Sequence, residues 1–336
     1  MSTGANHPLA DANWISIFDS LALPSTSAGT RAFSARRVGG HHVAKDADGN
    51  PALLIRVAAD GRPRSPVPVR LANLRVEHSL HCRVSGDNAV GDEVLTAVQC
   101  STSDRQLHEY FLKAMQGVTA SLPHPARQRD VDELVDGLVA LFQAMREPPS
   151  ATVHGLWAEL FLIATSLNPG RLLEAWHNEP SNRYDFDLND ERLDVKSSID
   201  RTRRHYFSLE QVQPPVGINA YIVSVFVERS SDGLSLGELW DSVRTLASHN
   251  PSLVLKVEHV CTKTLGVSWF EARSLRFDEA VAVESIAIYD AMVIPSVPRS
   301  LPVEVCEVRF RSDLTASPTI RTSTDPASIL SAIAQQ

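Results

Sequence analysis

The segment that most constrains this chain covers residues 183–198 and reads RYDFDLNDERLDVKSS. Apolar and polar residues alternate in both halves, as is typical of a strand with one buried face and one polar face. Asn189-Asp190 separates the halves and suits a two-residue hairpin turn, although Asn-Asp is a weaker turn signal than Asn-Gly. We therefore predict a β-hairpin in this segment.

The predicted hairpin has a polar face that carries a specific set of charges. If Phe186 pairs with Leu193, Asp185 lies opposite Asp194, with Cβ atoms about 5 Å apart. Lys196 follows Asp194 by two residues and shares its face. A longer turn would shift the pairing by one residue and break this face. A solvated surface is the plain alternative interpretation, and the tripeptide Asp194 to Lys196 alone favours it.

Composition bounds the class of protein. The chain has 336 residues, more than one typical domain, and its 43% hydrophobic and 21% charged residues are ordinary for a globular protein. The net charge of -8 argues against a protein that coats nucleic acid nonspecifically, but allows an enzyme with a local basic groove. Because no signal-like or membrane-spanning run occurs, we expect a cytoplasmic protein with no membrane partner. The four cysteines are far apart and predict buried thiols.

A β-rich lobe that ends in helices is predicted over residues 1–148. Strand-like segments separated by Gly, Pro, Asn and Asp clusters fill residues 33–100, with a strong turn at residues 48–51. NWISIFDSLAL predicts a short helix before these strands. Two helices follow them, one capped by Ser103-Asp104 and one over residues 130–145. This lobe should be largely antiparallel.

The second predicted domain, residues 149–336, begins with an apolar helix over residues 152–167. Asn168-Pro169-Gly170 is expected to end this helix. Glu159 is its only acid, and a carboxylate in such surroundings needs a partner or a metal to offset desolvation. The helix is expected to be largely buried, with one apolar row formed by Leu156, Leu160, Ile163 and Leu167.

The rest of this domain predicts an α/β core with a mixed sheet. NAYIVSVFVE at residues 219–228 is a nearly continuous β-branched and aromatic run, as expected for a central strand. The other predicted elements are a short helix beginning at Ser208, helices over residues 236–248 and 251–264, strands at 285–294 and 303–311, and a final helix before residue 336.

Two opposed aspartates beside a lysine suit a divalent-cation phosphodiesterase site. Mg²⁺ takes hard oxygen ligands, and usually keeps water and substrate phosphate in its remaining positions. A bound metal lowers the pKa of a water ligand and neutralises charge that develops on the phosphate. Lys196 would orient that water or stabilise the developing charge.

These residues resemble the PD-(D/E)xK nuclease superfamily, which has the restriction-endonuclease-like fold. The matching pieces are a glutamate on a helix (GLWAEL, Glu159), a strand aspartate (YDFDL, Asp185), and the acid-x-lysine tripeptide on the next strand (LDVKSS). Two positions depart from the pattern: Tyr184 replaces the proline of the name, and the acid before x-Lys is Asp194 instead of the commoner glutamate. The resemblance is good over about residues 150–230.

The resemblance implies a set of site residues. Asp185 and Asp194 would hold Mg²⁺ (or Mn²⁺) together with the Val195 carbonyl, and Glu159 would be an accessory ligand. Lys196 would be the catalytic lysine. The residue that resembles the phosphate- or water-orienting glutamine of several branches is Gln211.

The resemblance also implies an activity and partners. The chain looks similar to bacterial PD-(D/E)xK motif proteins of phage-defence loci, so the expected activity is hydrolysis of DNA phosphodiester bonds by a metal-dependent endonuclease in restriction or anti-phage defence. Expected partners are DNA and other defence-system proteins, and a homodimer would suit double-strand cutting. The alternative is a catalytically weak or inactive subunit that keeps the fold and acts in the assembly of a defence complex.

A basic run follows the hairpin. Arg201, Arg203, Arg204 and His205 are candidates for contacts with the DNA backbone, where phosphate contacts position a protein without reading sequence. A solvated loop is an equal alternative for the arginines, and a structural role for the histidine. Ser197 has no base at nucleophile spacing in the sequence, so a serine hydrolase is not predicted.

Overall fold

The computed structural model describes residues 13–25, 31–58, 67–85, 90–120, 122–179, 181–298, 302 and 304–333. The chain divides into two compact units. One comprises Met1–Gln143 with Ser248–Leu255, and the other comprises Ala144–Ala247 with Lys256–Gln336. The domain boundary that we place near residue 148 from the sequence stays a prediction.

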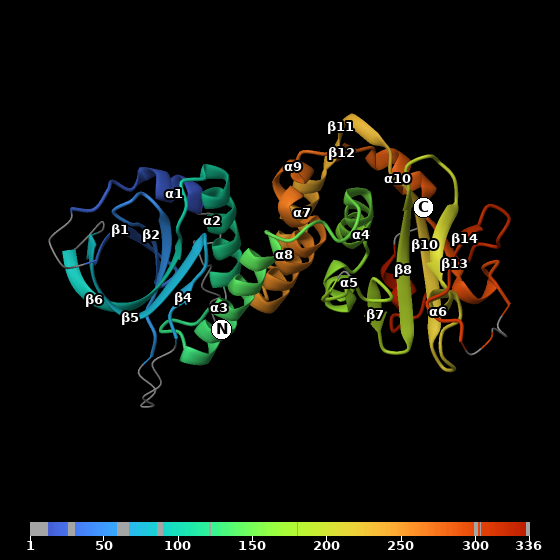
Figure 1. Cartoon of the computed structure of the whole chain (residues 1–336), viewed down its shortest axis with the longest axis horizontal. Coiled ribbons are helices and arrows are strands. Elements are labelled where there is room, and N and C mark those ends of the chain that lie inside the picture. The colour runs from blue at the N-terminus through green and yellow to red at the C-terminus, as the bar shows by residue number, and fades with distance from the viewer. Residues whose placement is uncertain are drawn as a thin grey trace, which may run out of the picture. The chain divides into compact units, whose positions relative to one another are not determined.

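The first unit is built around a six-stranded sheet that closes on itself (Figure 1). Neighbouring strands pair antiparallel except β1 and β5, whose parallel pairing completes a ring of the five strands β1, β2, β3, β6 and β5. The strands are β1 (Arg31–Val38), β2 (His41–Lys45), β3 (Pro51–Ile55), β4 (Val69–Arg70), β5 (Leu74–Ser85) and β6 (Val90–Cys100). The predicted antiparallel β lobe is thus confirmed, and the parallel closure is new.

Small and apolar side chains form one buried cluster in this unit, and all of them come from the five strands of the ring: Phe33, Ala35, Ala44, Ala52, Leu54, Cys82, Val84, Leu95 and Ala97. Gly49 has a φ of +84° in the turn between β2 and β3, which is where we predicted a tight turn. Closing the ring buries this cluster without an open sheet edge between β1 and β5.

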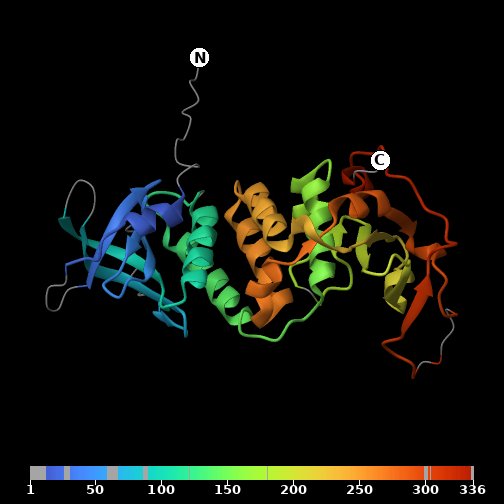
Figure 2. The ribbon, with the colours of Figure 1, turned by 90° about the horizontal axis from the view of Figure 1, so that it is seen from above.

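Three helices accompany the sheet of the first unit. They are α1 (Trp14–Ser20), α2 (Arg105–Thr119) and α3 (Gln128–Ala144), all close to their predicted bounds. The Asp104 side chain caps α2 by accepting a hydrogen bond from the Gln106 backbone N–H. Contacts of α2 with β3 and β6 place it beside the strands, as both views show (Figures 1 and 2).

The second unit contains a four-stranded mixed sheet in the order β13-β10-β8-β7. β10 pairs parallel with β8, while β7 and β13 pair antiparallel with their neighbours. The strands are β7 (Phe186–Leu188), β8 (Glu191–Ser198), β10 (Asn219–Phe226) and β13 (Ala287–Asp290). β10 is an inner strand, as its continuous apolar run predicts. An α/β fold with a mixed sheet is therefore confirmed.

Two smaller strand pairs and a series of helices complete the second unit. The strand pairs are β11 (Arg229–Ser235) with β12 (Arg276–Phe277), and β9 (Arg204–Ser208) with β14 (Arg309–Asp313). The helices are α4 (Val153–Thr165), α5 (Pro169–Ala175), α6 (Leu209–Val212), α7 (Leu236–Ala247), α9 (Trp269–Arg273) and α10 (Glu279–Ser285). Helix α8 (Pro251–Leu265) has its first residues in the first unit and the rest in the second.

Several boundaries differ from the sequence-based prediction. Asn168-Pro169-Gly170 begins α5 instead of only ending α4, because Asn168 caps the new helix and Pro169 is at its first position. Leu167, which we placed in the buried row, is 74% exposed. The β9 strand was not expected, and β14 begins after most of the predicted strand. The final helix is a 3₁₀ turn, Ile329–Ala332, and residues 334–336 lie outside the described part.

Two further findings concern the whole described chain. Cys82, Cys100 and Cys261 are buried free thiols, whereas Cys306 is exposed. The helices in the described ranges include none with the length and apolar character needed to cross a membrane.

Candidate metal centre

The hairpin has the predicted register. Phe186 pairs with Leu193, Asp187 with Arg192, and Leu188 with Glu191, with Asn189 at φ +53° in the turn. β7 begins only at Phe186, so Asp185 lies just before the strand. The Asp185 backbone N–H still donates to the Leu193 carbonyl, at 3.1 Å. The hairpin therefore brings Asp185 next to β8 at the level of Leu193 and its neighbours.

Asp194 and Lys196 extend from the same face of β8. Asp194 is 3% exposed, and the Lys196 ammonium lies 2.8 Å from its Oδ2. Lys196 Nζ also lies 5.5 Å from the centre of the Phe207 ring of β9. The two side chains thus contact each other and neighbouring protein groups. They do not form the solvated polar face of the alternative interpretation.

Asp185 is anchored by its own side chain. Its Oδ2 accepts a 2.6 Å hydrogen bond from the Val195 N–H of β8. This bond orients the carboxylate beside the strand that carries Asp194 and Lys196. The role of the Val195 carbonyl as a ligand stays a prediction.

Glu159 reaches the same place from α4, which packs against β8 (Figure 1). Thr152 caps this helix, so Glu159 lies in its second turn. Glu159 Oε2 accepts hydrogen bonds from Trp176 Nε1 at 2.8 Å and from His177 Nε2 at 3.0 Å. The half-buried carboxylate therefore has partners, as its apolar surroundings require.

His177 is a site residue that the sequence did not reveal. It is 7% exposed, and its backbone N–H donates to the Asp185 carbonyl at 2.7 Å. Glu159, His177 and Asp185 each offer a ligand atom, and these atoms lie within 4.8 Å of one another. The one sequence feature that points to His177 is that it lies near Asp185 along the chain. This is weak evidence, because a single histidine in a loop belongs to no periodic pattern.

Gln211 meets the site from α6. Its Nε2 donates to Asp194 Oδ1 and to the Arg183 carbonyl, both at 2.8 Å, while its Oε1 accepts from the Ser208 N–H at 3.0 Å. The last bond is half of a capping box at the start of α6. Gln211 therefore fixes the orientation of the Asp194 carboxylate.

Tyr184, which stands where the family name has proline, anchors the hairpin to the same helix. Its hydroxyl donates to the Glu210 carbonyl at 2.8 Å and approaches the Gln211 carbonyl at 3.3 Å. Burial raises the pKa of Tyr184 to about 12, so the hydroxyl keeps the proton that it donates. A tyrosine thus supports Asp185 from the neighbouring position.

Electrostatics favour a cation in this cluster. Burial, together with Glu159 and Asp194, raises the pKa of Asp185 well above its usual range, and burial also raises the pKa of Asp194. The pKa of Lys196 is raised, because the surrounding carboxylates outweigh the opposite effect of its burial. Three carboxyl groups face one ammonium, so a divalent cation would compensate the excess negative charge. Oxygen donors and an imidazole make a donor set that fits such an ion.

The four residues of the basic run do not share one surface. Arg201 is exposed and pairs with Glu228, and Arg204 lies 3.7 Å from Asp313. Arg203 donates to the carbonyls of Ser224 and Ser285.

The His205 ring is 4% exposed and lies 2.8 Å from Ser224 Oγ. The structure gives it an internal partner, which was our alternative interpretation for this residue. Contact of Arg201 and Arg204 with a DNA backbone stays a prediction.

Ser197 has a base that sequence spacing did not indicate. His154 Nδ1 of α4 lies 2.7 Å from Ser197 Oγ, and burial lowers the pKa of His154. His154 Nδ1 also lies 3.5 Å from Thr152 Oγ1. No carboxylate bonds to this ring within the described ranges, so a Ser/His/Asp arrangement is not formed there.

Comparison with protein families identifies the family of this chain. A family model described as "Putative PD-(D/E)XK family member", DUF4420, matches residues 14–315. No curated protein and no solved structure matches the chain significantly. The family match extends over both structural units and includes every residue of the candidate metal centre described above. The chain therefore belongs to the DUF4420 family of PD-(D/E)XK proteins.

Proposed function

We propose that this protein is a metal-dependent endonuclease that hydrolyses DNA phosphodiester bonds. The observation that carries the proposal is the convergence of Glu159, Asp185, Asp194 and Lys196 from one helix and one hairpin. Asp194 is buried, Glu159 and Asp185 are half-buried, and the three carboxylates surround a single ammonium. Such an excess of negative charge away from water suits the binding of a cation and, beside it, a phosphate.

Asp185, Asp194, Glu159 and His177 would hold the metal, Mg²⁺ or Mn²⁺. When bound, such an ion activates a water molecule and neutralises charge on a phosphoryl oxygen. Within the protein, Gln211 keeps Asp194 in one orientation, and the Val195 N–H does the same for Asp185. Trp176 aligns Glu159 by its indole hydrogen bond.

Lys196 would act as a positive charge. Its raised pKa keeps the ammonium protonated near neutral pH, so it stabilises negative charge or donates a proton, and does not abstract one. Its contact with Asp194 Oδ2 holds it beside the proposed ligands. A substrate phosphate that approaches the cluster would meet this ammonium.

The test is cleavage of supercoiled plasmid DNA by the full chain with Mg²⁺ or Mn²⁺. Asp194→Asn and Lys196→Met should each reduce cleavage by roughly a hundredfold or more. Asp187→Asn is a matched control, because Asp187 lies in the same hairpin but has a side chain that is 65% exposed and pairs with Arg192. Cleavage that survives both substitutions and EDTA would falsify the proposal.

Isothermal titration calorimetry with Mn²⁺ separates this proposal from its alternative. A binding-only or assembly subunit of a defence complex would give no metal signal and no cleavage. A role in restriction or anti-phage defence would appear as reduced phage plating on cells that carry the wild-type gene but not the Asp194→Asn variant. Light scattering would decide whether the chain forms the homodimer that double-strand cutting favours.

A further inference from the structure

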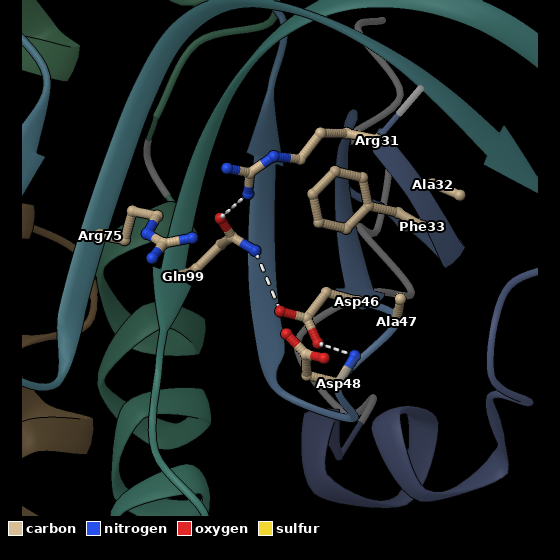
Figure 3. Close-up of a pocket in the computed structure, with 8 residues that line it drawn as sticks. All are labelled: Arg31, Ala32, Phe33, Asp46, Ala47, Asp48, Arg75 and Gln99. Atoms are coloured by element: carbon tan, nitrogen blue, oxygen red, sulfur yellow. Dashed lines mark hydrogen bonds between the residues drawn. The ribbon is translucent and has the colours of Figure 1, made fainter. Parts of the chain in front are cut away.

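A second site candidate lies at one mouth of the ring of strands in the first unit. A cavity of about 380 Å³ is lined there by eight residues: Arg31, Ala32, Phe33, Asp46, Ala47, Asp48, Arg75 and Gln99 (Figure 3). This volume lies within the range of small-ligand pockets, and mouths of β-barrels are common places for them. No residue of the metal centre belongs to this cavity.

Register explains why polar groups gather at this mouth. Gln99 follows the interior residue Ala97 by two positions on β6, and Arg31 precedes the interior residue Phe33 by two positions on β1. Arg75 of β5 pairs directly with Gln99. Because alternate residues of a strand share a face, these three side chains continue the interior face beyond its last apolar layer.

Gln99 is a buried lining residue of the cavity, and hydrogen bonds hold its side chain in place. It is 2% exposed, its Oε1 accepts from Arg31 Nη1 at 3.5 Å, and its Nε2 donates to Asp46 Oδ2 at 3.1 Å. The Asp46 carboxylate also accepts from the backbone N–H groups of Asp48 and Asn50. Asp46 is therefore committed to the β2–β3 turn, and Figure 3 shows it below Gln99 with Arg31 above.

The positive charge of the arginines at this mouth favours the binding of an anion. Arg75 lies directly opposite Arg70 in the β4–β5 pair, and like charges in such positions repel. In the ranges that the structure describes, neither guanidinium has a carboxylate partner. Arg31 has one, Glu77, at 2.8 Å. A phosphate would relieve the repulsion and match the planar donor geometry of a guanidinium.

A hydrogen-bond acceptor lies on the other side of the same cavity. The Asp48 side chain is exposed, and within the described part of the chain no donor bonds to its carboxylate. A carboxylate is a natural acceptor for the exocyclic amino group of cytosine. A nucleotide combines a phosphate with such a donor and is of a size that suits a cavity of this volume.

We propose that the mouth of the β-ring is a binding pocket for a nucleotide with an amino-bearing base. Arg75 and Arg31 hold the phosphate, and Asp48 accepts from the amino group. The inference rests on the proposed function only in taking DNA as one source of this nucleotide, a free mononucleotide being the other. The role of the first unit would then be to select the DNA strand or base on which the proposed nuclease acts.

Calorimetry on the full chain in EDTA tests the pocket without the metal centre. The probes are dCMP, dTMP, inorganic phosphate, a 12-nucleotide single strand of deoxycytidine, and the dipeptide glycylglycine. We expect dCMP to bind more tightly than dTMP or phosphate, and the Asp194→Asn variant to bind dCMP like wild type. Tighter binding of the oligonucleotide than of dCMP identifies a DNA strand as the source, and the reverse identifies the free nucleotide.

Two variants assign the contacts. Arg75→Gln should weaken dCMP binding roughly tenfold or more, because a charge-assisted bond to phosphate is lost. Asp48→Ala should remove the preference for dCMP over dTMP, because alanine has no acceptor for the amino group. The control is Arg129→Gln, which removes the same charge from an exposed position of α3 outside the cavity. Circular dichroism confirms that each variant is folded.

Three results would overturn the inference. One is the absence of saturable nucleotide binding by folded wild type, and another is equal affinity for phosphate and dCMP, which would leave only an anion pocket. The third is tighter binding of a dipeptide, whose ammonium and carboxylate suit the same charges. Loss of plasmid cleavage in the metal-centre variants has no bearing on any of these outcomes, so the two proposals fail separately.

Discussion

The carboxylate of Asp185 accepts a 2.6 Å hydrogen bond from the backbone N–H of Val195. Asp185 precedes the first residue of β7, so its own side chain helps to attach this end of the hairpin to β8. One oxygen is thereby committed to the backbone, and the other is left for the cluster. Asp185 thus stabilises the hairpin through Oδ2 and offers its other carboxylate oxygen as a proposed metal ligand.

Asp185→Asn should stabilise the metal-free protein. Asparagine keeps an acceptor for the Val195 N–H but removes a buried charge that lies beside two other carboxyl groups. We expect an increase of about 1–2 kcal/mol in the free energy of unfolding without metal. Chemical denaturation in EDTA measures it.

The same variant should lose the stabilisation that metal gives to wild type. Ligand binding to the folded state alone raises stability in proportion to the logarithm of metal concentration. Melting curves with increasing Mn²⁺ should shift for wild type and for the Asp187→Asn control, but not for Asp185→Asn. A metal-dependent shift of equal size in all three would contradict the proposed ligand.

His177→Ala should reduce the preference of the site for Mn²⁺ over Mg²⁺. Imidazole suits transition ions better than Mg²⁺, which prefers oxygen ligands. Wild type should therefore bind Mn²⁺ more tightly than Mg²⁺, and the variant should narrow the ratio of the two dissociation constants. His259→Ala is the matched control, since His259 also contacts a glutamate, Glu179, at 3.1 Å, but outside the cluster. An unchanged ratio in His177→Ala would exclude His177 as a ligand.

Gln211→Leu should weaken the site through Asp194. The substitution removes the donor that orients the Asp194 carboxylate, and groups in this position typically contribute 10- to 100-fold, so we expect a loss of about that size in Mn²⁺ affinity or cleavage rate. Gln213→Leu provides the comparison, because Gln213 makes one long contact, 3.5 Å, with the Val297 carbonyl. Equal effects of the two substitutions would show that only α6 packing was disturbed.

His205 should make the second unit sensitive to acid. Burial, assisted by Lys196 and Arg203, lowers the pKa of His205 to about 4 from an unfolded value of 6.5. The unfolded chain therefore binds more protons between these values, and stability falls as pH drops from about 6.5 towards 4. The contribution is on the order of 3 kcal/mol when fully developed. Denaturation of wild type and His205→Gln across this range should show a smaller slope in the variant.

Local patterns predicted much of the second unit. The hairpin register followed from alternation and a two-residue turn, and both are properties of neighbouring residues. The inner position of β10 followed from its continuous apolar run. A lone acid in an apolar helix predicts a partner for Glu159, and Trp176 and His177 supply it.

The features that local patterns did not predict depend on contacts between distant residues. His177 joins the cluster because the segment after α5 runs back beside Asp185. Asn168-Pro169 predicts the end of α4, but the same residues also begin α5, which the sequence pattern does not show. β9 was missed because its partner, β14, lies more than a hundred residues away. The parallel pairing of β1 with β5 leaves no mark in the alternation of either strand.

Gln211 belongs both to the capping box of α6 and to the bond with Asp194. During synthesis on the ribosome, a chain that has emerged only as far as β8 carries the acid-x-lysine tripeptide but neither this glutamine nor the flanking strand β10. The proposed nuclease would thus remain inert as a nascent chain until these later residues have left the exit tunnel.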